Sequence, residues 1–254
     1  MERGRGGIET IDDAIAAMDA EIDRCLDTND PCGYFAIVYR AVTDRVRRGI
    51  AAGVFEDNER MEHFDVVFAR RYLDSRAGWH AGQSIPDSWR VAFEAGGRPR
   101  HLVLQHLLLG INAHINLDLG VAVASSSDTG EIDPLRADFD LVNDVLAEMV
   151  DKMQDAIAST SPIARVVDLA ALRFDEAFVT FNIRQARNDA WEFATELSQC
   201  PLDDRGALER TRDVEVSRLG ARIVRPIRPV RWMVSAASYR ERHDLHGVMR
   251  VIAT

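Results

Sequence analysis

Residues 101–124 read HLVLQHLLLGINAHINLDLGVAVA, and this stretch decides the fold. It is apolar almost all the way round a helical turn, which is typical of a helix buried on every side. Seven polar side chains are nevertheless spread along it: His101, Gln105, His106, Asn112, His114, Asn116 and Asp118. Because an unpaired buried polar group costs roughly 1–3 kcal/mol, we expect each of them to have a partner in protein, water, metal or ligand.

The segments on either side of this stretch also favour helices. Apolar residues recur every three to four positions, and no segment of note alternates with the period of two that marks a half-buried strand. Predicted helices cover residues 11–27, 32–52 and 58–73, a short stretch after Pro86, and stretches after Pro134, Ser161 and Pro201. We therefore predict an all-α chain, a single-domain bundle of eight to ten helices over residues 1–254, around a buried central helix at about 101–124.

Composition and charge limit the classes of function. With 254 residues, of which 46% are hydrophobic, the chain has enough apolar material for a core. Its net charge of −10 opposes binding to phosphate backbones, so no nucleic-acid partner is expected. No uninterrupted apolar run reaches the length of about 18 residues that spans a bilayer, and residues 1–7 contain no apolar signal core. The three cysteines form no Cys-x-x-Cys pair, so we expect a soluble, cytoplasmic protein without a membrane partner.

The C-terminal part of the chain has the opposite charge. Between Arg205 and Arg250, eleven arginines stand against five acidic residues. We expect residues 205–254 to form a basic C-terminal extension that packs on the acidic body of the same domain. The alternative is that this extension docks another molecule. The oligomeric state is left open by the sequence.

The polar side chains of the central stretch fall on two different sides of a helix. At 100° per residue, Asn112 and Asn116 share one side with His101 and Gln105. His114 and Asp118 lie on another side, about 160° and about 120° away from Asn112. We therefore expect two separate polar surfaces on one helix, unless the helix breaks at Gly110.

His114 and Asp118 are four residues apart, so both side chains reach one point beside the helix. Imidazole nitrogen and carboxylate oxygen together form half of a site for zinc, iron or manganese, and Glu59 and His63 have the same spacing on another predicted helix. The sequence thus predicts a divalent-metal site made of His114, Asp118, His63 and Glu59. The alternatives are that His114 and Asp118 only hydrogen-bond each other, and that Glu59 and His63 belong to a solvated helix face.

A second group of polar residues follows Phe181. Arg184, Arg187, Asn188 and Trp191 fall on one broad face of a predicted helix, and an arginine there could hold a carboxylate or a phosphate. We expect Arg184 and Trp191 to bind substrate, and the alternative is that these arginines pair with acidic residues of neighbouring helices. Gly-x-Gly-x-x-Gly, Walker and Gly-x-Ser-x-Gly motifs are absent from the sequence, so nucleotide-binding and α/β-hydrolase functions have no support.

The string LLLGINAHINLDL at residues 107–119 is similar to the hallmark of an uncharacterised bacterial family, a domain of unknown function. Members of that family show a helix with the pattern Leu-Gly-x-Asn-Ala-His-Ile-Asn-x-Asp-Leu. Shorter segments that also fit are Phe35–Thr43, Phe68–Tyr72 and Ser88–Phe93, so the resemblance covers most of residues 10–200. It implies a helical domain centred on Asn112, His114 and Asp118, and it implies no particular activity.

Three functions are compatible with these patterns. The first is a metal-dependent or acid–base enzyme for a small organic substrate, with His114 as ligand or general base and Asp118 as co-ligand or orienting group. In it Asn112 belongs to the catalytic set and Asn116 binds substrate. The second is a metal-free helical pocket for an apolar small molecule, as in a cyclase or a carrier. The third is a non-enzymatic interaction module that docks its partner through residues 205–254.

Overall fold

The computed structural model describes residues 7–97, 101–126, 130–143, 145–146 and 183–225. These residues form helices joined by short connections, and none of them lies in a β-strand, which confirms the all-α prediction. The α-helices are α1 (Ile11–Thr28), α2 (Gly33–Ala51), α3 (Asn58–His80), α4 (Asp87–Gly96), α5 (Val103–Ala113), α6 (Leu119–Ser125), α10 (Ile183–Gln199) and α11 (Leu202–Val224). Two predicted segments lie outside the described part: the helix predicted after Ser161 as far as residue 182, and residues 226–254 of the C-terminal extension.

Local sequence signals account for the helix ends near the N-terminus. Thr10 caps α1 and forms a capping box with Asp13, as its hydroxyl predicts. Asn29 ends the same helix in the left-handed region, with φ of 53°, which asparagine tolerates better than most residues. Helix α3 continues to His80, beyond the predicted end at residue 73. Arg76 on its last turns is buried, so these turns still pack against the rest of the protein.

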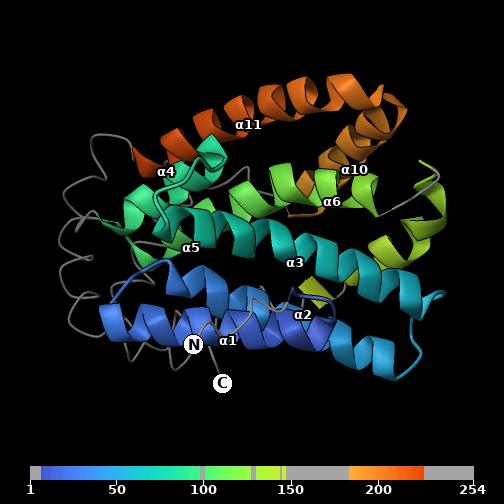
Figure 1. Cartoon of the computed structure of the whole chain (residues 1–254), viewed down its shortest axis with the longest axis horizontal. Helices are drawn as coiled ribbons and strands as arrows, with labels where there is room; N and C mark the ends of the chain where they lie inside the picture. Colours follow the sequence, from blue (N-terminus) through green and yellow to red (C-terminus); the bar gives the residue numbers. More distant parts are fainter. Residues whose placement is uncertain (1–6, 98–100, 127–129, 144, 147–182, 226–254) are drawn as a thin grey trace.

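The helices form layers around the apolar helix (Figure 1). Helices α1 and α2 pack against each other at one side of the molecule, and α10 and α11 lie at the other side. Between them runs a continuous helix, Val103–Ser125, made of α5, a π-helical turn and α6, which we name the central helix. Helices α2 and α3 contact it from one side and α10 and α11 from the other. The prediction of a buried central helix is therefore confirmed.

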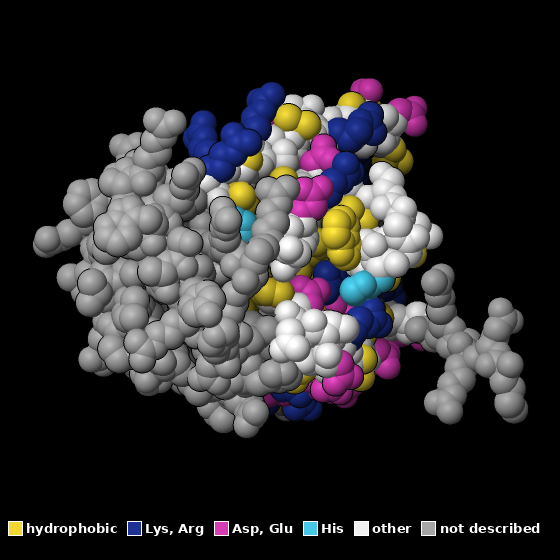
Figure 2. Space-filling model, turned by 90° about the vertical axis from the view of Figure 1, so that its left-hand side faces the viewer, with side chains coloured by type: hydrophobic (Ala, Val, Ile, Leu, Met, Phe, Trp, Pro, Cys, Tyr) yellow, Lys and Arg dark blue, Asp and Glu magenta, His cyan; other side chains and the backbone are white. Residues whose placement is uncertain are grey.

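By length and composition the central helix could cross a membrane, and it is the one helix of the described residues that meets this criterion. However, 89% of its apolar window is buried inside the protein, as in the core helix of a soluble protein. Exposed large hydrophobic side chains are few and scattered among the described residues: Val54, Leu141, Leu202 and Val214. On the face drawn in Figure 2, described basic and acidic side chains are interspersed. Among the described residues, these few apolar side chains do not form the large apolar patch that a lipid-facing surface has.

Gly110 allows α2 to come close to the central helix. A Cβ atom at this position would overlap the ring of Phe35, so any larger residue would push α2 away. The chain remains helical through Gly110, and the break considered there in the sequence does not occur. The irregularity lies one turn later, at His114–Asp118, where the backbone forms a π-helical turn.

Candidate functional site

The π-helical turn contains the histidine and the aspartate that the sequence singled out. The backbone N–H of Leu119 donates to the carbonyl of His114, five residues back, instead of four. Such turns are rare and often occur at functional sites, because they alter how side chains project from a helix. Here the turn leaves His114 and Asp118 on the same side, both buried, with exposed fractions of 2% and 0%.

Asp118 is held by hydrogen bonds from three side chains. Trp89 Nε1 donates to its Oδ2 over 2.8 Å, and Arg71 Nε donates to its Oδ1 over 3.3 Å. His114 Nδ1 lies 3.2 Å from Oδ2. Since a carboxylate accepts hydrogen bonds, Nδ1 is the donor nitrogen of the ring and Nε2 is the nitrogen left as acceptor.

Arg71 supplies the positive charge beside Asp118. It comes from α3, and its other end pairs with Glu209 of α11, so one guanidinium connects α3, the central helix and α11. A buried carboxylate needs a counter-ion and hydrogen bonds to stay ionised. Arg71 supplies the counter-ion of Asp118, and Arg71 and Trp89 supply hydrogen bonds to its two oxygens.

The imidazole of His114 is enclosed by aromatic rings. The Phe68 ring stacks on it with a centroid distance of 3.7 Å, and the Tyr39 ring lies 4.2 Å away in an edge arrangement. Burial lowers the pKa of His114 below the ordinary value of 6.5, although Asp118 acts in the opposite direction. The ring is therefore neutral near neutral pH. Its Nε2 is buried and has no hydrogen-bond partner among the described residues.

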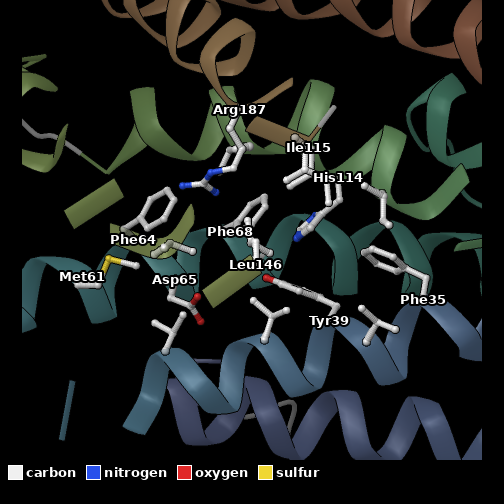
Figure 3. A pocket seen from close by; sticks show the side chains of 17 residues that line it. Phe35, Tyr39, Met61, Phe64, Asp65, Phe68, His114, Ile115, Leu146 and Arg187 are labelled. Carbon is white, nitrogen blue, oxygen red and sulfur yellow. The ribbon is translucent and has the colours of Figure 1, made fainter. Parts of the chain in front are cut away.

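A cavity of about 80 Å³ opens beside this histidine (Figure 3). A single water needs roughly 10–15 Å³ on the same measure, so the space suits a small organic molecule better than one water. Apolar side chains from α2, α3, the central helix and α10 form most of its wall. Figure 3 labels five of these, Phe35, Met61, Phe64, Phe68 and Ile115, and also Leu146, which lies between the central helix and α10 in the sequence.

Three further polar side chains line the cavity. The sequence placed Arg187 on the predicted arginine face, although Arg184 and Trp191 were chosen as the binding residues, and Tyr39 and Asp65 were not among the predicted site residues. The Tyr39 hydroxyl and Oδ2 of Asp65 are buried without hydrogen-bond partners in the described structure. Arg187 reaches the same cavity from α10. Burial, and secondarily the negative charge of Glu62, raises the pKa of Asp65 to about 7. A signal was available for Asp65, because it is four residues after Met61 and three before Phe68 on an apolar helix face.

Asn112 and Asn116 face away from the cavity, on the other side of the central helix. Asn112 Nδ2 donates to the Val216 carbonyl of α11 over 3.0 Å, and Asn116 Nδ2 donates to Asn112 Oδ1 over 3.0 Å. The predicted separation into two polar surfaces therefore agrees with these contacts. The structure does not bring Asn112 to His114 as a catalytic partner, nor Asn116 to the cavity, because their amides attach α11 to the central helix.

The two residues predicted to bind substrate on α10 also lie elsewhere. Arg184 is exposed at the surface. Trp191 is buried against Phe139, with a ring distance of 4.9 Å, and the Arg136 guanidinium covers its ring. Neither residue lines the cavity, whereas Arg187, one turn from both, does. The residue of this helix that projects into the cavity therefore differs from the two predicted to bind substrate.

The predicted metal ligands are not brought together. Glu59 and His63 are exposed on α3, whereas His114 and Asp118 are buried. Within the described residues no group of three or more His, Cys, Asp or Glu side chains could hold a metal ion. Both oxygens of Asp118 already accept hydrogen bonds, so the carboxylate has little capacity left for a cation.

Comparison with known proteins places the chain in one family. A model described as a family of unknown function (DUF5995) matches residues 11–226, which is most of the chain and includes the central helix, the cavity residues and α11. No curated protein and no solved structure matches the chain.

Proposed function

The chain belongs to DUF5995, a family of unknown function, and from this premise we propose that it is an acid–base enzyme for a small, largely apolar organic molecule. One observation carries the proposal. His114 Nε2 is a buried acceptor without a partner at the wall of an apolar cavity, while Nδ1 is fixed by Asp118. A neutral imidazole held in one tautomer by a carboxylate is the usual arrangement of a general base.

In this proposal His114 takes a proton from the bound molecule through Nε2. The positive charge that then forms on the ring is stabilised by Asp118, which also pairs with Arg71. The Tyr39 hydroxyl is a neutral donor near the ring, and the apolar wall excludes water from the transfer. The substrate fits by its apolar body and presents one acidic proton to His114.

Acid–base chemistry is favoured over the metal-dependent form because of the donor set. A metal at His114 would need Nε2 and at least two further ligands. The side chain of this cavity that could add a carboxylate is Asp65, whose raised pKa of about 7 weakens it as an anionic ligand near neutral pH. The Glu59 and His63 pair is too far out on the solvated face of α3 to contribute.

The test uses two histidine variants of the full-length protein. His114→Gln removes the base at the cavity, and His106→Gln changes a histidine that is also buried on the central helix but does not line the cavity. Both are assayed with a panel of small ketones and other molecules that carry an acidic C–H bond, by deuterium uptake from heavy water. We expect turnover of a panel member by the wild-type protein and His106→Gln, and a loss of at least about a hundredfold in His114→Gln. Equal turnover in His114→Gln would contradict the proposal.

A carrier is the second candidate, and the predominance of apolar side chains in the cavity wall favours it. In a carrier the same compounds bind without being converted. Binding by the wild-type protein, with no conversion of any bound compound in either variant, would support this function over the enzyme. Val42→Phe fills the cavity from α2 and should abolish binding in both cases.

The interaction-module alternative has less support from the described part of the C-terminal region. Val216 and Ile223 of α11 are buried, and α11 packs on α4 and α5. The first part of the predicted extension therefore contributes to the core. A cytoplasmic location remains part of the proposal, and it agrees with three cysteines that are free thiols: Cys25, Cys32 and Cys200.

A further inference from the structure

Arg187 is a buried cation at the wall of the cavity, and no described carboxylate forms an ion pair with it. The charge of Asp140, which is paired with Arg136, acts on Arg187 only from a longer distance. Its exposed fraction is 2%, and it makes no ion pair among the described residues. Nε donates to Asn143 Oδ1 over 2.6 Å, and one terminal nitrogen donates to the Phe139 carbonyl. Both acceptors are uncharged. A buried charge without a counter-ion is costly, so its presence in an apolar wall calls for an explanation.

The fixed position of Arg187 makes it suitable for recognition. Asn143 and the Phe139 carbonyl take two of its five N–H donors, and the Phe139 ring lies 4.0 Å from the guanidinium carbon. These contacts hold the group in one orientation, and no described residue accepts a hydrogen bond from its other N–H groups. Burial lowers the pKa of Arg187 to about 9, so the guanidinium is still charged near neutral pH.

The other polar groups of the cavity lie apart from Arg187. Figure 3 shows that Arg187 enters from α10, whereas Asp65 and Tyr39 come from α3 and α2 on the facing side. Asp65 makes no ion pair with Arg187, so it does not serve as the missing counter-ion. A ligand between these walls would place one end at Arg187 and another part near His114.

We propose that the cavity takes a small, apolar carboxylic acid whose carboxylate pairs with Arg187. This inference rests on the proposed function, because it names the class of molecule that the same cavity holds. A carboxylate has one charge and two oxygens in a plane, which match one guanidinium with unused N–H donors. A phosphate monoester carries nearly two charges and three acceptor oxygens, which a single buried cation among apolar side chains would leave unbalanced.

The experiment compares acids with their isosteric amides. Phenylacetate and phenylacetamide, and hexanoate and hexanamide, are titrated into the wild-type protein by calorimetry or by NMR. Because a charge-assisted pair adds more than a neutral hydrogen bond, we expect each acid to bind about tenfold to a hundredfold more tightly than its amide. Equal affinities of acid and amide, or failure of all four compounds to bind, would overturn the inference.

Matched arginine variants locate the preference. Arg187→Gln and Arg187→Lys are compared with Arg136→Gln, whose arginine also lies over the Phe139 ring but is solvent-accessible and paired with Asp140. We expect Arg187→Gln to bind acid and amide equally, Arg187→Lys to keep a reduced preference, and Arg136→Gln to behave as the wild type. A preference that survives in a folded Arg187→Gln protein would contradict the assignment. If Arg187→Gln does not fold, the Lys variant and the wild-type ratio decide.

The outcome is separable from that of the proposed function. Acid preference lost in Arg187→Gln, together with unchanged turnover in His114→Gln, would support the anion site and refute the base. Turnover lost in His114→Gln, with equal binding of acids and amides, would support the base and refute the anion site.

Discussion

Both sides of the central helix carry buried polar side chains, but the two sides differ in how the polar atoms of these side chains are hydrogen-bonded. On one side Asn112 donates to a backbone carbonyl of α11, Asn116 donates to the Asn112 side chain, and Arg212 of α11 donates to the Asn116 carbonyl. On the other side the chain of hydrogen bonds from Arg71 and Trp89 through Asp118 ends at His114 Nε2, beside a cavity. Burial of a polar residue in an apolar helix therefore does not by itself indicate a functional site. What marks the His114 side as the candidate site is an unpaired polar atom, Nε2, next to a cavity.

The largest expected effect is on the His114 side, at Asp118. In Asp118→Ala the Arg71 cation and the Trp89 N–H lose their common acceptor, and breaking such a buried pair costs about 3–5 kcal/mol. Urea unfolding followed by circular dichroism measures the loss. Asp140→Ala is the control, because the Asp140 pair with Arg136 is half-exposed and we expect it to contribute less than about 1 kcal/mol. Equal losses in the two variants would show that Asp118 does not anchor the site.

A smaller effect is expected on the asparagine side. Asn112→Ala leaves the Asn116 amide and the Val216 carbonyl without their partner, so we expect a loss of about 1–3 kcal/mol in the free energy of unfolding. Ligand affinity and turnover should remain as in the wild type, because Asn112 does not line the cavity. The comparison with His114→Gln is decisive: a fall in turnover of similar size in both variants would remove the distinction between the two sides.

Asp65 is expected to make stability depend on pH. Its pKa is raised to about 7 in the folded protein from an ordinary value of 3.8, so the folded state holds an extra proton between these values and stability falls as pH rises through this window. Asp65→Asn lacks this loss. We expect the difference in melting temperature between Asp65→Asn and the wild type to increase by about 5 °C, in favour of the variant, from about pH 5 to pH 8.

The Asp65 measurement isolates one group because the histidines are common to both proteins. His106 and His114 have lowered pKa values, so they weaken the fold as pH falls below about 6.5, in the opposite direction. Glu59→Gln is the control, since Glu59 is an exposed carboxylate on the same helix. Parallel melting curves of Asp65→Asn and wild type at every pH would mean that Asp65 is ionised in the folded protein.

Helical periodicity was enough to predict most of the fold. The period of apolar residues and Thr10 as a cap locate the first two helices, predicted at residues 11–27 and 32–52, to within a residue or so. The apolar stretch at residues 101–124 predicts the central helix, and its polar residues divide into the two sides that the contacts show. Periodicity, caps and apolar stretches are local properties, so they can be recognised in the sequence without knowing which helices pack together.

The cavity could not be predicted in the same way. It is formed by side chains from α2, α3, the central helix and α10, together with Val142 and Leu146, and the sequence does not state which faces of distant segments meet. Arg184 was selected over Arg187 because both lie on one broad helical face, and only the packing of α10 determines which one projects inward. The π-helical turn at His114–Asp118 likewise has no local signal that sequence patterns of period 3.6 would reveal.

The most direct test of the account is the protonation state of His114 in the folded protein. ¹⁵N NMR of the imidazole nitrogens, with the signals assigned by their loss in His114→Gln, distinguishes the two neutral tautomers from the imidazolium. We predict a neutral ring at about pH 7, with the proton on Nδ1 facing Asp118 and a bare Nε2 whose signal moves when a cavity ligand is added. A proton on Nε2 at that pH, in either the neutral or the charged ring, would contradict the account.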